Sequence, residues 1–193
     1  MSKTSKVWVP VVIAVGAAAA SAYAARGRGP EIREFFIKQT LERPVLNSSY
    51  AELAQRLERG GVELTGRFER AGESAGNRKA LRHIIGIERW GTARIERMNT
   101  GAPSAELDGH RSYKPPRDAS WAELLADLQT TRAHTVDLAR RLDTSPPADG
   151  LTVPHNDLGD LTPKGWLRYL ALHANIESRR VRSSGESGNL QLS

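Results

Sequence analysis

The chain contains no cysteine, which excludes disulfide bonds, thiolate metal ligands and a cysteine nucleophile. Aromatic residues make up only 6% of its 193 residues, and β-branched residues are also sparse. Alanine, leucine, arginine and glutamate are abundant instead, and these residues favour helices. A chain of this length can form one domain with a substantial hydrophobic core. The composition therefore predicts a single, mainly helical domain.

Acidic residues are missing from the first part of the chain, and this accounts for most of its net charge of +6. Residues 1–30 contain four basic residues and no acid, so the remainder carries 24 basic and 22 acidic residues. An excess of two positive charges is too small for the phosphate contacts that a nucleic-acid-binding surface makes. We therefore expect no specific binding to nucleic acid.

One long run without charge extends from Val7 to Ala25. As a helix its 19 residues would span roughly 28 Å, close to the ~30 Å of a bilayer core. Residues 22–24 form an Ala-x-Ala cleavage pattern, which indicates a secretory signal instead. We therefore expect residues 1–30 to be a signal peptide or a transmembrane anchor plus linker. The protein would be exported, or attached to a membrane through residues 7–25, with its orientation undetermined.

Residues 31–182 show helical periodicity, and residues 183–193 form a Ser/Gly-rich tail that we expect to be disordered. The expected helices are a short one at 31–41, ended by Pro44, and four long ones at 50–70, 77–98, 121–142 and 162–182. Ser49 and Glu52 have the spacing of a capping box before the first long helix. Gly60-Gly61 interrupts that helix and would allow a kink or the close approach of a neighbour. Two loops, residues 99–118 and 143–160, join the long helices, and loops of this length are often functional.

The last long helix carries an imidazole and a carboxylate within an apolar strip. Trp166, Leu170, His173 and Glu177 fall on one side of it at 3.6 residues per turn. His173 and Glu177 are therefore one turn apart, roughly 6 Å along the axis. Burial of both groups is unfavourable unless something compensates them. A metal ion would do so, because both are good ligands; a His–Glu hydrogen bond that orders the core is the alternative.

The helix expected at 77–98 has two apolar strips, so it should lie between neighbouring helices. One strip contains Leu81, Ile84, Ile85, Glu88 and Ile95, and the other contains Ala80, His83, Ile87, Trp90 and Arg94. A single histidine in such a strip is more often a hydrogen-bonded core residue than a ligand. The pair on the last helix makes His83 a candidate third ligand.

Three segments of the chain resemble the DinB-like four-helix-bundle superfamily. They are ALRHIIGIERWGTARI (80–95), HNDLGDLTPKGWL (155–167) and LALHANIE (170–177). The resemblance covers residues 45–182, and it implies an all-α, DinB-like four-helix bundle with the short N-terminal helix as an addition. It also implies a divalent-metal site of three histidines, one from the second helix and an H-x-x-x-H pair from the fourth. These positions correspond to His83, His173 and Glu177, where Glu177 replaces the second histidine of the pair.

Two histidines and one carboxylate suit Zn²⁺ with an open position, or Fe²⁺, Mn²⁺ or Ni²⁺. A bound metal would lower the pKa of a water or thiol and so produce a nucleophile near neutral pH. The resemblance implies thiol-dependent S-transferases or isomerases, which use a low-molecular-weight thiol, and metal-dependent hydrolases. Trp90, Arg94 and His155 would lie around the ligands. For His155 a hydrogen bond that orders its loop is the alternative to a contact with substrate.

The competing hypothesis is a non-catalytic, membrane-attached helical scaffold with a vestigial metal site. In that case Glu177 would pair with Arg94 or Arg180. Ligand atoms converging within about 4–5 Å of a common point favour the enzyme, whereas an arginine filling that point favours the scaffold. Both hypotheses allow a homodimer and leave the substrate undetermined.

Overall fold

The computed structural model describes residues 34–99 except residue 36, and residues 109–181. The expected N-terminal segment, residues 1–30, and the expected disordered tail, residues 183–193, lie outside this part of the chain. The described elements are, in order, the π-helical turn η2 (Lys38–Glu42), the 3-10 turn η3 (Arg43–Val45), the helices α3 (Tyr50–Ala71) and α4 (Ala75–Asn99), the 3-10 turn η4 (His110–Tyr113), helix α5 (Trp121–Thr144), the strands β1 (Val153–His155) and β2 (Gly159–Leu161), and helix α6 (Pro163–Ser178).

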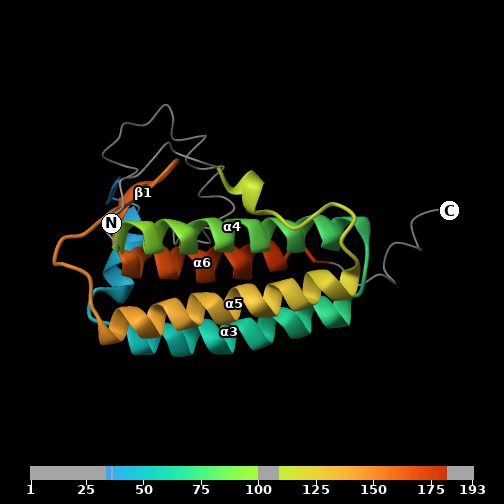
Figure 1. Ribbon diagram of the computed structural model, residues 1–193, viewed down its shortest axis with the longest axis horizontal. Coiled ribbons are helices and arrows are strands. Elements are labelled where there is room, and N and C mark those ends of the chain that lie inside the picture. The colour runs from blue at the N-terminus through green and yellow to red at the C-terminus, as the bar shows by residue number, and fades with distance from the viewer. Residues whose placement is uncertain (1–33, 36, 100–108, 182–193) are drawn as a thin grey trace, which may run out of the picture.

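The four long helices lie side by side, with α4 and α6 in one layer and α3 and α5 in the other (Figure 1). Helix α3 packs on α5 and α6, and helix α4 packs on the same two helices. The all-α prediction is confirmed, since the described chain is helical apart from its loops and one short hairpin.

Local chemistry explains where the long helices begin. The Ser49 hydroxyl accepts a hydrogen bond from the Glu52 amide, and the Glu52 carboxylate accepts one from the Ser49 amide. This is the predicted capping box at the start of α3, and such a cap contributes about 1 kcal/mol. At the start of α6 the Thr162 hydroxyl accepts from the Gly165 amide, and Pro163 occupies the first turn. The first turn tolerates proline because its amides have no partner within the helix.

The chain before α3 departs from the prediction that Pro44 ends a short helix. The helical path continues through η2 into η3, where Pro44 lies in the first turn. Proline is acceptable there for the same reason as at the start of α6. The segment is attached to α6 by Glu42, whose carboxylate accepts hydrogen bonds from the Thr162 amide (2.9 Å) and the Thr162 hydroxyl (2.6 Å).

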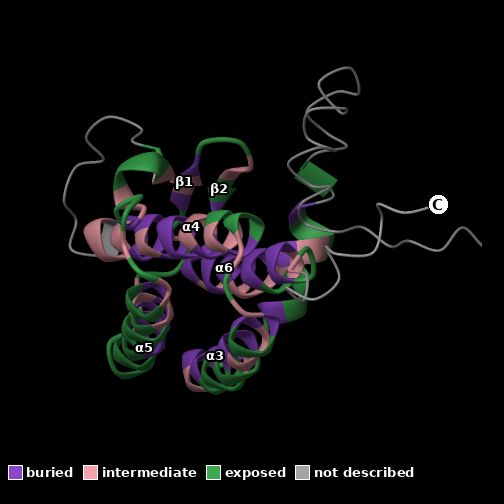
Figure 2. Ribbon diagram, turned by 90° about the vertical axis from the view of Figure 1, so that its right-hand side faces the viewer, coloured by how far each residue is buried: buried purple, intermediate pink, exposed green. Residues whose placement is uncertain are grey.

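A β-hairpin occurs where the sequence predicted only a loop. Strands β1 and β2 pair antiparallel, with Val153 opposite Leu161 and His155 opposite Gly159. Gly159 has φ of 79°, a conformation that favours glycine. The hairpin lies against α4 and α6, on the side away from α3 and α5 (Figure 2). It therefore covers the layer that carries the candidate ligands.

The expectation of a transmembrane helix needs correction. No helix within residues 34–99 and 109–181 is long and apolar enough to cross a membrane. The physical reason is that these helices are amphipathic, with a buried apolar side and a charged side exposed to solvent. The run from Val7 to Ala25, on which the transmembrane and signal-peptide expectations rested, lies outside the described residues.

Helix α4 is buried on two sides, as its two apolar strips predict. Leu81, Ile85 and Ile95 are fully buried on one strip, and Ile87 and Trp90 are buried on the other. Helix α4 accordingly lies between α5 and α6. Its strip facing α6 is the one that carries His83, so the packing of this helix positions the candidate site.

The Gly60-Gly61 pair does not interrupt α3, which is one continuous helix from Tyr50 to Ala71. The close-approach alternative is the one seen. A Cβ on Gly61 would lie 2.6 Å from the Arg132 Cγ, so the absence of a side chain at Gly61 lets Arg132 pack directly against α3. Arg132 continues to the buried Glu88 carboxylate, which its Nη2 reaches at 2.9 Å.

Candidate metal centre

Helices α4 and α6 approach closely because Gly91 has no side chain. A Cβ at Gly91 would lie 2.8 Å from Leu170 Cδ2 and 2.9 Å from Trp166 Cζ3, which is too close for any real side chain. Gly91 is about two turns beyond His83 on α4, and Leu170 is about one turn before His173 on α6. The approach at Gly91 therefore places the two histidines within reach of each other across the helix interface.

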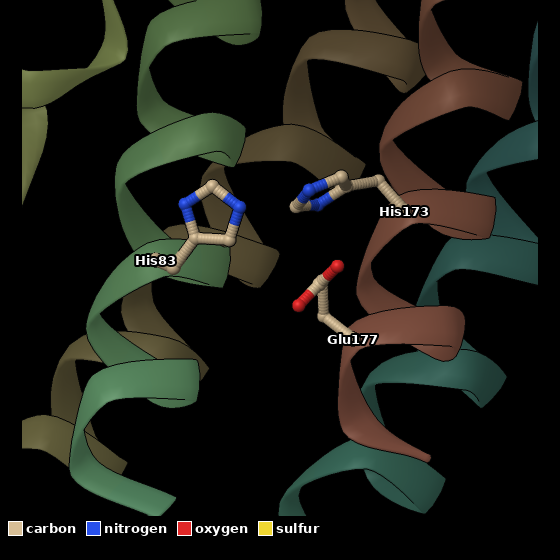
Figure 3. Close-up of side chains that lie close together, drawn as sticks. All are labelled: His83, His173 and Glu177. Carbon is tan, nitrogen blue, oxygen red and sulfur yellow. The ribbon is translucent and has the colours of Figure 1, made fainter. Parts of the chain in front are cut away.

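His83, His173 and Glu177 converge, as the sequence predicts. Each offers one nitrogen or oxygen atom, and these three atoms lie within 4.8 Å of one another. Figure 3 shows His83 reaching from α4 toward His173 and Glu177 on α6. The two imidazole centroids are 5.0 Å apart, with an interplanar angle of 71°. His173 and Glu177 are buried, and His83 is partly buried.

The surroundings keep both imidazoles neutral. Burial, together with the positive charge of Lys114, lowers the pKa of His83 to about 4. Burial is also the main reason that the pKa of His173 is lowered to about 3, with His83 next to it adding to the effect. A neutral imidazole is the form that binds a metal ion. At neutral pH both rings therefore have a nitrogen lone pair available for a ligand bond.

Of the two arginines considered as partners of Glu177, Arg180 contacts its carboxylate and Arg94 does not. The Arg180 Nη1 donates to a Glu177 carboxylate oxygen at 3.2 Å, but the Arg180 side chain is 64% exposed. Arg94 instead donates to the Pro154 carbonyl at 2.8 Å and lies over the Trp90 ring, 4.8 Å from its centroid. The contact with Glu177 thus comes from the solvent side at the end of α6, and Arg94 ties α4 to the hairpin.

An aromatic wall continues from the candidate ligands toward the hairpin. The Tyr169 ring lies 5.7 Å from His173 and 4.8 Å from His155, measured between centroids. The Trp90 ring lies 5.1 Å from His155 and 5.2 Å from Trp166. Trp90, His155, Trp166 and Tyr169 are all buried. Together they shield one side of the centre from water, which strengthens electrostatic interactions inside it.

His155 orders the hairpin and is held in one tautomer. Its Nδ1 accepts hydrogen bonds from the Asp157 amide (3.1 Å) and the Leu158 amide (3.2 Å), so the proton of the neutral ring is on Nε2. Burial, followed by the charge of Arg94, lowers the pKa of His155 to about 3. The loop-ordering role considered from the sequence is therefore present. Nε2 is buried and has no hydrogen-bond partner among the described residues, which leaves one N–H donor available.

His110 is the residue of this region that the sequence reasoning missed. Its ring lies 5.1 Å from that of His83 and 6.5 Å from that of Trp90. Turn η4 can lie directly on α4 because a Cβ on Gly86 would be 2.6 Å from Lys114 Cγ and 3.2 Å from the His110 carbonyl oxygen. Burial and the charge of Lys114 lower the pKa of His110. The available signal was a histidine in a long loop, but no periodicity connects that loop to α4.

The donor set fits a divalent metal ion. Two ligands of a tetrahedral ion are about 3.4 Å apart when each bond is ~2.1 Å. Separations of up to 4.8 Å would therefore have to shorten by up to about 1.4 Å, or about 0.7 Å for each of two side chains. Two imidazoles and one carboxylate would leave at least one position of a tetrahedral ion for water or substrate. The described residues thus contain a group that could hold a metal ion.

In comparisons with known proteins, no protein-family model matches the chain, and no curated protein or solved structure matches it either. The resemblance to the DinB-like superfamily therefore remains a resemblance. The function is inferred from the side chains of the centre.

Proposed function

We propose that the protein is a divalent-metal-dependent enzyme that activates water or a low-molecular-weight thiol, as a hydrolase or a thiol S-transferase. His83, His173 and Glu177 would hold the metal. The observation that carries the proposal is the convergence of these three donor atoms within 4.8 Å at a partly buried interface between α4 and α6. When bound, the metal would lower the pKa of a water or thiol toward neutrality.

The chain's own residues would prepare the centre in three ways. Neutral His83 and His173 offer lone pairs without first losing a proton. The wall that includes Trp90 and Tyr169 keeps bulk water from one side. His155 presents a fixed Nε2–H donor, two ring contacts from His173, to an acceptor oxygen of a substrate.

A composition of two imidazoles and one carboxylate suits Zn²⁺, and it also accommodates Fe²⁺, Mn²⁺ or Ni²⁺. We favour Zn²⁺ because imidazole nitrogen and a single carboxylate are common donors in catalytic zinc sites. The absence of cysteine means that a thiol nucleophile would have to come from a small molecule. Hydrolysis needs only water, so the centre suits a hydrolase as well as a thiol S-transferase.

A non-catalytic helical scaffold is the second candidate, and one observation favours it. The Arg180 guanidinium contacts the Glu177 carboxylate at 3.2 Å and so partly satisfies its charge without a metal. However, the Arg180 side chain is 64% exposed, so it does not occupy the space between the three donor atoms. The enzyme therefore remains the better-supported proposal.

Metal content tests the centre directly. Full-length protein is incubated with Zn²⁺, desalted and analysed by inductively coupled plasma mass spectrometry. We expect about one equivalent for wild type and a loss of at least tenfold for His83→Ala/His173→Ala. His134→Ala is the matched control, because His134 is exposed and pairs with Glu96 on the opposite side of α4 and α5. Equal metal content in all three proteins would refute the centre.

Arg180→Gln separates the two candidates. If Glu177 is a metal ligand, removal of its competitor Arg180 should increase metal affinity. If the Glu177–Arg180 pair is instead the final state of a scaffold, the substitution should not change metal binding, which would be absent in wild type as well. The zinc-loaded protein is then assayed with an activated ester and with a small thiol plus an aryl chloride. Activity in either assay should disappear with a chelator and return with Zn²⁺.

A further inference from the structure

A groove lies between α3 and α6, on the side of α6 away from the metal centre. Its volume is about 260 Å³, and its apolar floor is formed mainly by leucines, among them Leu53, Leu57, Leu64, Leu167 and Leu172. The two helices run in the same direction, as Figure 1 shows. At one end the Arg67 Nη1 donates to the Ser178 hydroxyl at 2.6 Å, which closes the groove.

Gly60 keeps the middle of the groove open. It lines the groove, and a Cβ built on it would meet no heavy atom within 4 Å. Its neighbour Gly61 faces the opposite situation, because Arg132 fills the space beside it. Gly61 therefore makes room for Arg132, whereas the space beside Gly60 is available to a ligand.

The polar lining of the groove is strongly biased toward positive charge. Four arginines line it, Arg56, Arg67, Arg132 and Arg168, and Glu63 is the only acid among the lining residues. Arg56 makes no hydrogen bond or ion pair within the described chain, and Glu63 does not neutralise any of the four. The charge of the arginines is thus only partly compensated by the protein.

Two of these arginines gather at the end of the groove near the start of α6. Arg168 is anchored by its Nε, which donates to the Thr40 carbonyl at 2.6 Å, so its two terminal nitrogens remain for another acceptor. Arg56 lines the same groove, and burial and the charge of Arg56 lower the pKa of Arg168. An anion bound between these two like charges would be stabilised by both.

Arg132, which also lines the groove, contributes a buried donor without a partner. Its side chain is buried, with a residue exposure of 6%, and its Nη2 is paired with Glu88. Its Nε has no hydrogen-bond partner among the described residues. A buried donor without an acceptor is unfavourable by about 1–3 kcal/mol. An alkyl chain offers no acceptor, so a water in the groove is the group that would satisfy this donor.

From these features we infer that the α3–α6 groove is a binding site for an alkyl carboxylate. The carboxylate head lies between Arg56 and Arg168, and the alkyl chain extends along the leucine floor past Gly60 toward Arg67. A guanidinium fork matches a carboxylate in a bidentate manner. The stretch of α6 from Arg168 to Ser178 sets a limit of about 15 Å on the length of the ligand. A singly charged head matches the two arginines near the start of α6, and an apolar chain matches the leucine floor; Arg67 at the far end already donates to Ser178.

This site does not depend on the proposed enzyme function. His173 and Glu177 face α4, whereas Ala171 and Ala174 of the same helix line the groove facing α3. Removal of metal should therefore leave binding of the carboxylate unchanged. Failure of either proposal leaves the other intact.

Decanoate is the probe, titrated into full-length protein and followed by isothermal titration calorimetry in the presence of a chelator. We expect saturable binding at one site per chain. Arg56→Gln/Arg168→Gln should weaken it at least tenfold, and Gly60→Leu, which fills the groove, should do the same. Arg59→Gln/Arg179→Gln is the matched control, because it removes two exposed charges outside the groove, one from α3 and one from the residue that follows α6. That control should stay within twofold of wild type.

Further ligands define the chemistry. Decanol, which lacks the charge, and acetate, which lacks the chain, should each bind at least tenfold more weakly than decanoate. The inference is overturned if decanoate does not saturate, or if the control double variant loses as much affinity as Arg56→Gln/Arg168→Gln. Tenfold tighter binding of decyl phosphate would assign the groove to phosphate esters instead. Binding that weakens as protein concentration rises would assign it to a second copy of the chain. Circular dichroism of every variant establishes that loss of binding is not loss of folding.

Discussion

Metal affinity at the proposed centre should be almost independent of pH between 7.5 and 5.5. A proton competes with a metal for an imidazole nitrogen, so acid normally weakens histidine sites. For two exposed histidines with the usual pKa of about 6.5, lowering the pH from 7.5 to 5.5 weakens binding about tenfold per ring. The combined effect of two such rings would be about 100-fold, or about 2.7 kcal/mol.

The structure predicts a different result because burial has already excluded the proton. With a pKa of about 4 for His83 and about 3 for His173, both rings are neutral throughout this range. The fraction of protonated His83 at pH 5.5 is only about 3%, so proton competition at the two imidazoles changes the dissociation constant by less than about twofold. Metal binding at pH 6 should likewise release almost no protons from the imidazoles, compared with about 1.5 from an exposed pair.

Calorimetry in two buffers of different ionisation enthalpy measures the released protons, and a zinc indicator measures the affinity at pH 7.5, 6.5 and 5.5. The matched control is Thr130→His in a His83→Ala/His173→Ala background. It creates an exposed pair with His134 at i,i+4 spacing on α5. The control should lose far more affinity than wild type over the same pH range. A comparable loss in wild type would show that the two imidazoles of the centre are solvated, and the reasoning from burial would be wrong.

Three further predictions concern stability. In the folded protein His155 has a pKa of about 3, so it stays unprotonated down to that pH. In the unfolded state its pKa is about 6.5, so the unfolded state binds more protons below pH 6.5. The contribution of His155 to stability should therefore be constant above pH 6.5 and fall by up to about 1.4 kcal/mol per pH unit below it. Urea unfolding of wild type and His155→Phe at pH 7.5 and 5.5 should show a smaller acid loss in the variant. Gly61→Ala should destabilise the protein by about 1–3 kcal/mol. Gly60→Ala, whose added methyl group meets open space, should stabilise it by about 0.5–1 kcal/mol. Equal melting temperatures for the two variants would contradict the packing of Arg132 against Gly61. Glu88→Ala should cost about 3–5 kcal/mol because Arg132 stays buried without its partner, whereas Glu88→Leu/Arg132→Met should recover most of that loss in the same unfolding assay.

The sequence by itself determined the features that depend on neighbours within one helix. Ser49 and Glu52 predicted the start of α3 because a cap is complete within four residues. The two buried strips of α4 followed from a period of 3.6 residues. His173 and Glu177 share a side of α6 for the same reason, so two of the three candidate ligands are placed by local structure. The grouping of these two residues with His83 was implied by the resemblance to the DinB-like superfamily, and the structure brings all three together.

Tertiary structure decided everything that depends on which surfaces meet. The β1–β2 hairpin was not foreseen, since its strands have three residues each and contain proline and charged residues, which are poor indicators of strand. His110 reaches His83 only because Gly86 lets η4 lie on α4, a contact between residues far apart in sequence. The choice of Arg180 rather than Arg94 as the partner of Glu177 also depends on the hairpin, which supplies the carbonyl that binds Arg94. Helical periodicity specifies the direction of a side chain from its own axis, and only the packing of helices, turns and hairpin specifies what that side chain meets.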